Sequence, residues 1–186
     1  CAARHIGLAL AKSAISIGKK IAFAYNCDDV QDIKLHYSAA KEYLKNKRSG
    51  GIGKVDNSVG DKVEMIISDI KSYIYAMHYM LAFNEAHTII TYWDEPTITL
   101  DYKEHEYHKL IKQIWQENLI PNMVLSSATL PHPKDTRETF MDFRCKFSNA
   151  NEFSIISNDC KKSVKLIDQD GYVKVPHNIA SNFDDM

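Results

Sequence analysis

Short apolar runs alternate with amphipathic stretches along this chain, and that alternation is the feature that most constrains its fold. Residues 21–25 are a continuous apolar run, and residues 63–67, 88–93 and 123–127 are mostly apolar, which is typical of parallel strands covered on both faces. Between them, apolar residues recur three or four positions apart, which indicates helices. Alternation of strand and helix predicts right-handed crossover units, and hence an α/β fold with a mostly parallel sheet and helices on both sides.

The predicted helices have recognisable start and stop signals. Gly18 stands where a C-terminal cap is expected, Asp28 and Asp29 signal a helix start, and Ser72 can begin another helix. The amphipathic pattern predicts helices over residues 2–17, 30–44, 72–81, 107–119 and 140–147.

The remaining segments are less regular. Residues 45–61 are polar and glycine-rich, which predicts a surface loop. Residues 153–156 are a candidate strand, and residues 163–175 resemble a hairpin turned at Asp170-Gly171. We expect a domain edge near Asn158, so that 1–157 is the main domain and 158–186 is a linker or the start of a following region.

Composition and charge exclude some classes of function but do not select one. A chain of 186 residues with 45% hydrophobic and 25% charged residues has room for one globular domain. A net charge of -1 means that contact with a polyanion must come from a local patch. The four cysteines include no CxxC pair, which favours reduced thiols inside a cell, and no apolar run reaches the roughly 18 residues of a membrane span.

Two adjacent carboxylates, Asp94 and Glu95, follow the third apolar run. In an open parallel sheet, ligands bind at the carboxyl ends of the strands. There Asp94 can hold Mg²⁺ through water, and Glu95 can orient and deprotonate the attacking water in nucleotide hydrolysis. Asp-Glu after a strand is also common in solvated turns and helix caps, and the pair alone does not decide between these interpretations.

A second polar segment, Ser127-Ala128-Thr129, ends the next predicted strand, one crossover unit later. Its hydroxyls can reach a neighbouring strand's carboxylate and report the state of that site to another surface. Alone, it is better explained as a strand end that caps the following helix.

Together these segments resemble a known family. Asp94-Glu95-Pro96-Thr97 resembles the Walker B box of DEAD/DEAH-like superfamily-two helicases, and Ser127-Ala128-Thr129 resembles their third motif. By order and spacing, Gly50-Gly51 is similar to the family's glycine doublet, and Ser68 to Lys71 occupy the position of a motif that contacts the nucleic-acid backbone. The resemblance covers residues 2–131, and residues 92–102 look most like helicase-like proteins of large nucleocytoplasmic DNA viruses.

The resemblance implies the first RecA-like domain of a helicase, a three-layer P-loop NTPase fold. It implies ATP and Mg²⁺ as cofactors, DNA or RNA as a partner, and a second RecA-like domain in the same protein. It also implies a cytoplasmic or nuclear location, with a viral gene as one source of the protein. Asp94 and Glu95 become catalytic residues. Ser127, Ala128, Thr129 and Thr97 couple the site to nucleic acid, and Gly50, Gly51, Ser68 and Lys71 bind it.

Two departures from the family stand out. Pro96 and Thr97 replace the usual Ala and Asp or His after Asp-Glu, so coupling has to run through the Thr97 hydroxyl. No GxxxxGK[ST] loop occurs in the 186 residues, since Val55 follows Gly53-Lys54. We expect the P-loop and the first strand upstream of Cys1, and we expect the isolated chain to be inactive.

Other functions stay open. The same fold can serve as a nucleotide- or nucleic-acid-binding module without turnover, or as a P-loop enzyme that uses no nucleic acid. His105 and His108 suggest zinc or a solvated helix face. A basic cluster near the glycine-rich loop can hold phosphates of a single strand or form a solvated helix end. Its members are Lys41, Lys45, Lys47, Arg48 and Lys54.

Overall fold

The computed structural model describes residues 4–99, 102–156 and 166–175, and it is a mixed α/β structure. The chain divides into two compact units, Cys1–Ala150 and Asn151–Met186. The domain edge predicted near Asn158 lies outside the described residues. Within those residues the strands form four small sheets rather than one continuous sheet.

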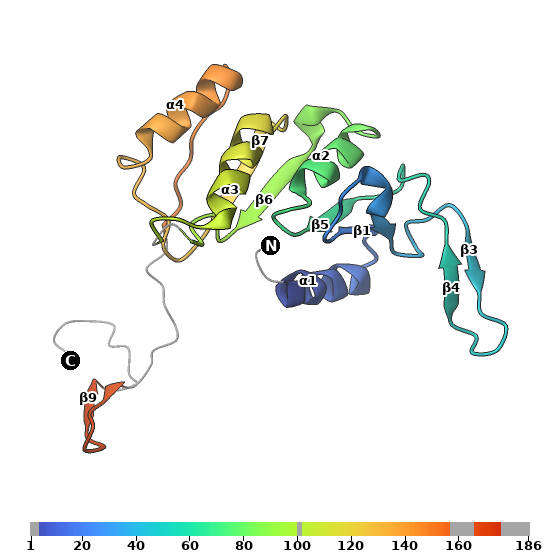
Figure 1. The fold of residues 1–186 in the computed structure, drawn as a ribbon, viewed down its shortest axis with the longest axis horizontal. Coiled ribbons are helices and arrows are strands. Elements are labelled where there is room, and N and C mark those ends of the chain that lie inside the picture. The colour runs from blue at the N-terminus through green and yellow to red at the C-terminus, as the bar shows by residue number, and fades with distance from the viewer. Residues whose placement is uncertain (1–3, 100–101, 157–165, 176–186) are drawn as a thin grey trace. The chain divides into compact units, whose positions relative to one another are not determined.

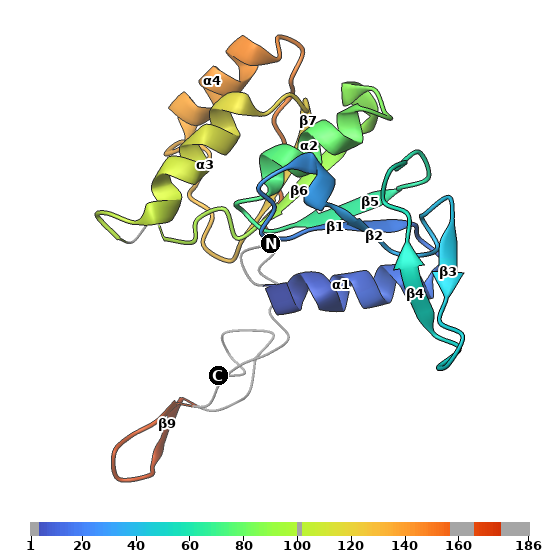
Figure 2. The same cartoon turned by 45° about the vertical axis from the view of Figure 1, so that its right-hand side comes forward.

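The first sheet has the order β2-β1-β5 and is covered by one helix on each face (Figures 1 and 2). β1 (Ile21–Ala24) pairs in parallel with β5 (Met65–Ser68) and antiparallel with β2 (Lys34–Leu35). Because successive side chains of a strand point to opposite faces, Ala22 and Ala24 pack with α2 (Tyr73–Leu81). Ile21 instead packs with α1 (Arg4–Ser16).

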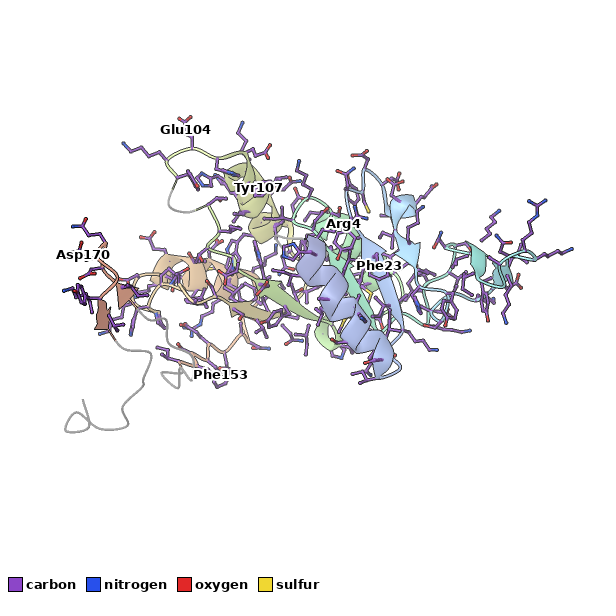
Figure 3. All side chains as sticks on the ribbon, turned by 90° about the horizontal axis from the view of Figure 1, so that it is seen from below. Arg4, Phe23, Glu104, Tyr107, Phe153 and Asp170 are labelled. Atoms are coloured by element: carbon purple, nitrogen blue, oxygen red, sulfur yellow. The ribbon has the colours of Figure 1, made fainter. Side chains whose placement is uncertain are left out.

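α1 and α2 begin and end close to the residues that the sequence indicated. Gly18 adopts φ +83°, and its N–H donates to the Ile15 carbonyl 2.9 Å away, which closes α1 as a C-terminal cap does. Ser72 precedes α2 and is buried, with its Oγ accepting from the Cys27 N–H at 2.9 Å. Phe23, labelled beside α1 in Figure 3, packs on the α1 side of the sheet.

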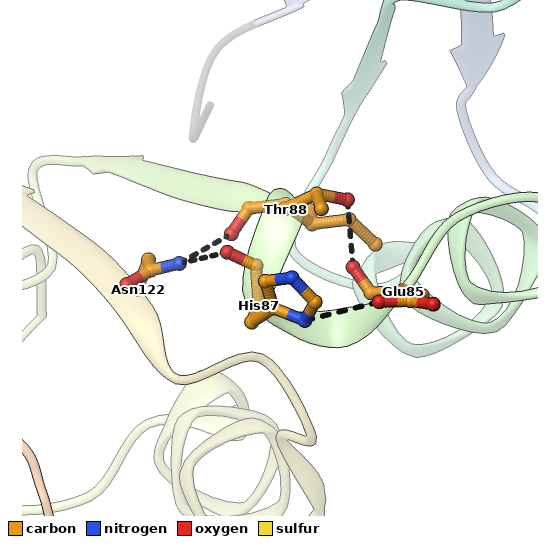
Figure 4. Close-up of polar contacts among 5 residues, drawn as sticks. Glu85, His87, Thr88 and Asn122 are labelled. Atoms are coloured by element: carbon orange, nitrogen blue, oxygen red, sulfur yellow. Dashed lines mark hydrogen bonds and ion pairs between the residues drawn. The ribbon is translucent and has the colours of Figure 1, made fainter.

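The second sheet pairs β6 (Ile90–Asp94) with β7 (Asn122–Ser126) in parallel, in continuous register from Ile90↔Asn122 to Asp94↔Ser126. α3 (Glu106–Glu117) connects the two strands as the crossover helix, and α4 (Arg137–Lys146) follows β7. Figure 4 shows what holds the amino end: the Asn122 side-chain amide donates to the carbonyls of His87 (2.8 Å) and Ile89 (3.3 Å). This contact fixes the turn before β6 against the start of β7.

A buried polar network joins α2, α3 and β6. The Tyr73 hydroxyl donates to Asn118 Oδ1 at 2.7 Å and shares a 3.2 Å hydrogen bond with the Thr91 hydroxyl. Asn118, 1% exposed, also donates to the Ile120 carbonyl and accepts from the Ile120 N–H. Burial raises the pKa of Tyr73, which keeps its hydroxyl protonated as a donor. Each buried polar group of this network therefore has a partner, as buried polar groups generally require.

Three local predictions are wrong, and the first concerns residues 30–44. The helix expected over residues 30–44 is replaced by a 3₁₀ turn (Val30–Asp32), β2 and a turn. The Asp29 start signal does form a capping box, but it opens only that short turn. Ile33 and Leu35, both buried, alternate as strand residues do, and pairing with β1 overrides the helical spacing.

The glycine-rich loop is a hairpin instead. β3 (Tyr43–Lys45) pairs antiparallel with β4 (Ile52–Val55) through a register shift. In the second unit, β8 (Leu166–Ile167) and β9 (Val173–Val175) form the predicted hairpin, with Gly171 at φ +86° in its turn. The strand expected over residues 153–156 does not form; these residues have no regular structure.

Gly60 offers a test of packing in the first core. A Cβ built at this position would lie 2.1 Å from the Tyr79 hydroxyl oxygen and 2.5 Å from two ring carbons, and Tyr79 is buried. We predict that Gly60→Ala lowers the free energy of unfolding by about 1 to 3 kcal/mol, because overpacked cores must shift. Urea denaturation measures this. Gly51→Ala, whose nearest non-neighbouring atom is 3.5 Å away, is the control; equal stability of the two variants contradicts the packing.

Candidate functional site

The site lies at the carboxyl ends of β6 and β7. The register places Asp94 opposite Ser126, and the Glu95 N–H continues the ladder by donating to the Ser126 carbonyl at 2.8 Å. The residues that follow each strand, Glu95 on one side and Ser127 on the other, therefore leave the sheet side by side. This is the edge at which open parallel sheets bind ligands.

Glu95 adopts a left-handed conformation with φ +52°. A non-glycine residue there is uncommon and is strained unless the surroundings hold it. Here its side chain is held: Glu95 Oε2 accepts a hydrogen bond from the Ser127 hydroxyl at 2.6 Å. This short oxygen–oxygen distance is typical of a hydroxyl that donates to a carboxylate. The carboxylate is therefore turned toward the end of β7.

The hydroxyls of Thr97, Ser127 and Thr129 form a closed cluster around this contact. Thr97 Oγ1 lies 3.1 Å from Ser127 Oγ and 3.0 Å from Thr129 Oγ1, and the latter two are 3.2 Å apart. Ser127 Oγ also accepts from the Thr129 N–H. The expected contact between Thr97 and the Ser127–Thr129 segment is therefore present, while Ala128 between them is exposed.

Asp94 is half-buried at the end of β6, and its carboxylate makes no hydrogen bond or ion pair with another residue that the structure describes. Three or more His, Cys, Asp or Glu residues do not gather into a metal-binding group anywhere in the described part of the chain. An unengaged carboxylate is a group that could hold Mg²⁺, because proteins usually bind this ion through one or two carboxylates together with waters and substrate phosphates.

Asp94, Glu95 and Ser68 also line one cavity of about 1090 Å³. Its walls come from β5, α2 and β6 and are mostly apolar, with Ile67, Met77 and Ile90 among the contributors. No sequence pattern indicated this cavity, because the strands that line it come from two separate sheets.

The predicted nucleic-acid residues fall on two different elements. Gly50 and Gly51 lie in the turn of the β3–β4 hairpin, whereas half-buried Ser68 ends β5 and exposed Lys71 precedes α2. The structure therefore does not gather these four residues on one element.

Asp69, which sequence reasoning did not select, organises the turn after β5. Its Oδ2 accepts from the Asn26 N–H at 2.7 Å and its Oδ1 from the Ser72 N–H at 2.8 Å. It thereby ties the segment after β1 to the start of α2. Buried Cys27 lies in the segment after β1, and burial raises the pKa of its thiol, so it stays protonated. The signal that could have found Asp69 is its place three residues before Ser72, because Asp side chains often accept from nearby backbone N–H groups in turns.

His105 and His108 have structural partners. His105 Nδ1 accepts from the Tyr107 N–H and caps α3, and His108 Nε2 lies 2.8 Å from the Thr99 carbonyl. Both are partly buried, so neither the zinc interpretation nor a freely solvated helix face describes them.

Comparisons with known proteins name no relative: a scan against protein-family models gives no match, and no curated protein or solved structure matches the chain. Across the described residues, none of the helices has the length and apolar character needed to cross a membrane.

Thr99 closes the strained turn and gives a test of it. It adopts φ +79°, unusual for a β-branched residue, and its hydroxyl is buried without a hydrogen-bond partner. We predict that Thr99→Gly raises the free energy of unfolding by about 1 kcal/mol, because strain of this kind costs about 1 to 3 kcal/mol and glycine's extra freedom in the unfolded chain offsets part of the gain. Thermal denaturation checks the sign.

The matched control is Thr139→Gly, because Thr139 is exposed within α4. This change lowers stability, since glycine disfavours helical backbone. A destabilised Thr99→Gly protein would mean that the turn is not strained.

Proposed function

We propose that this chain is the part of a nucleic-acid-dependent ATPase that supplies the magnesium-binding and water-activating carboxylates. The observation that carries the proposal is the contact of Glu95 with Ser127, itself bonded to Thr97 and Thr129, at the carboxyl ends of two parallel strands. Two segments 30 residues apart in sequence, each resembling a helicase motif, meet there through side-chain hydrogen bonds.

The proposed roles follow from the contacts. Asp94, free of protein partners within the described residues, would hold Mg²⁺ through water. Bound there, the ion would neutralise charge on the nucleotide phosphates. Glu95 would orient the attacking water and take its proton. Its Oε2 accepts from Ser127, and its other oxygen makes no hydrogen bond with a described residue, which leaves that oxygen for the water.

Thr97, Ser127 and Thr129 would relay the state of the site. Rearrangement at Glu95 changes the bond to Ser127, and Ser127 is bonded to both threonines. The Ser127 hydroxyl thus bonds directly to the proposed catalytic carboxylate. Among the described residues, the Thr129 hydroxyl bonds to the hydroxyls of Thr97 and Ser127 and not to that carboxylate. This difference separates catalysis from coupling in the experiments below.

Hydrolysis also needs groups that grip the phosphates, and no P-loop sequence occurs within these 186 residues. The tests therefore use an extended protein, in which a segment that carries a P-loop is joined ahead of these 186 residues. The 186-residue chain alone serves as the baseline, which we expect to show no turnover above that of its own Glu95→Gln variant.

In the extended protein, Glu95→Gln should lower ATP turnover by at least about 100-fold and leave ATP binding within about threefold, because the amide keeps the shape but cannot take a proton. Steady-state phosphate release and binding of a fluorescent ATP analogue measure the two quantities. Glu104→Gln, an exposed carboxylate before α3, is the control. Near-normal turnover with Glu95→Gln would leave a binding module without catalysis as the better account.

Thr129→Val tests coupling. It removes hydrogen bonds worth about 0.5 to 1.5 kcal/mol each without touching a carboxylate. Basal turnover should stay within about twofold, and its stimulation by single-stranded DNA or RNA should fall by at least about fivefold. Thr129→Ser, which keeps the hydroxyl, should restore stimulation. Stimulation that survives Thr129→Val would reduce this segment to a strand end with a turn.

A further inference from the structure

The β3–β4 hairpin extends to one side of the sheet in Figures 1 and 2. Every residue from Lys41 to Lys54 is exposed. Its turn is well ordered by local bonds: the Asn46 N–H donates to the Gly51 carbonyl at 2.8 Å, and the Gly50 N–H donates to the Asn46 carbonyl at 2.9 Å. Gly50, at φ +68°, supplies the left-handed residue that this turn requires. The hairpin therefore presents a defined surface.

Residues 41–55 carry five cationic side chains and one carboxylate, in a chain whose net charge is -1. Lys45, Lys47 and Arg48 lie at or beside the turn, while Glu42 and Asp56 lie at the base, where the Asp56 N–H donates to the Glu42 carbonyl. None of the five cationic groups makes an ion pair or a side-chain hydrogen bond with a residue that the structure describes. Unpaired positive charge is therefore concentrated at the tip.

Two exposed tyrosines stand at the base of the same hairpin. Tyr43 begins β3, and its ring lies 5.3 Å from that of Tyr37 at an interplanar angle of 65°. Tyr43 is 41% exposed and Tyr37 is 39% exposed. The Tyr37 ring also packs against the His36 ring at 4.4 Å, so Tyr43 is the more available of the two. Exposed aromatic rings beside cations are the combination that binds the bases and phosphates of single strands.

We propose that this surface, residues 41–55 together with Tyr37, binds single-stranded nucleic acid, with Lys45, Lys47 and Arg48 on phosphates and the two tyrosines against bases. Binding to duplex nucleic acid or to a membrane through charge alone would not need the two tyrosines. The choice of nucleic acid as the partner rests on the proposed function. The bound single strand would then lie on the β3–β4 hairpin, which is separate from the carboxylate site.

The test measures fluorescence anisotropy of a labelled 20-nucleotide single strand, DNA or RNA, with the whole 186-residue chain across a salt series. The first variant is the triple change Lys45→Gln, Lys47→Gln and Arg48→Gln. Removing three phosphate contacts should weaken binding at least about tenfold at moderate salt and reduce the slope of log K against log salt by about 2. The matched control neutralises three exposed lysines near or on α3: Lys103, Lys109 and Lys112.

The second variant, Tyr43→Ala, tests the stacking. Single-strand affinity should fall about tenfold, whereas affinity for a duplex of the same length should not change, because paired bases are not available to a surface ring. Tyr172→Ala, an equally simple change at an exposed tyrosine of the second unit, is the control. The eight altered side chains, four in the hairpin variants and four in the controls, are all exposed. Circular dichroism spectra check that each variant is folded.

Several results would overturn the proposal. They are the absence of single-strand binding by the unchanged chain, equal losses in the hairpin and α3 triple variants, or no effect of Tyr43→Ala. Hairpin-dependent binding to vesicles containing phosphatidylserine, with none to oligonucleotides, would assign the surface to a membrane instead. Because binding is measured without ATP, a negative result here leaves the ATPase proposal standing, and failure of the Glu95→Gln test leaves this one standing.

Discussion

The parallel pairing of β6 with β7 is the interaction on which the candidate site depends. Its register sets Asp94 opposite Ser126, and every contact in the site follows from that alignment. A shift of one residue would turn each side chain of a strand to the other face, and would part Glu95 from Ser127. The bonds from Asn122 to the turn before β6 hold the register at the opposite end of the sheet.

The turn after β6 stores strain in a short span. Glu95 and Thr99 are both left-handed, with four peptide bonds between them. Each is held by a neighbouring element: Glu95 by Ser127 of the β7 end, and the Thr99 carbonyl by His108 of α3. Strained residues persist only where the surroundings over-determine them. The tight turn brings the Thr97 hydroxyl to within hydrogen-bond distance of Ser127 and Thr129 after the end of β7.

The amino-acid pattern was informative where local and tertiary preferences agree. The apolar runs that become β1, β5, β6 and β7 and the amphipathic stretches that become α2 and α3 are all present close to the predicted positions. Prediction failed over residues 30–44, where helical spacing competed with pairing to β1, a contact with a strand that sequence periodicity cannot reveal. It also missed the β3–β4 hairpin, because its strands bury almost nothing and carry no alternating pattern.

Within the candidate site, Asp94, Glu95, Ser127 and Thr129 were selected from their places after two predicted strands together with the resemblance to helicase motifs, and Thr97 was selected from that resemblance alone. These signals were not enough to show which hydroxyl touches the carboxylate. That depends on the left-handed Glu95, which a sequence pattern does not encode for a non-glycine residue. Asp69 was missed for a related reason: its importance lies in two backbone N–H groups, of Asn26 and Ser72, whose proximity only the pairing of β1 with β5 creates.

These contacts also form a continuous physical connection between the turn after β5 and the carboxylate site. Asp69 caps Ser72, the next residue Tyr73 bonds to Thr91, and Thr91 lies on β6 three residues before Asp94. Contiguity alone does not establish energetic coupling, which needs an element with two arrangements that both sites bias. The Tyr73 hydroxyl is such a candidate, since it lies within hydrogen-bond distance of both Asn118 and Thr91 and has one proton to donate. Which acceptor it prefers would change with the position of β6 relative to α3.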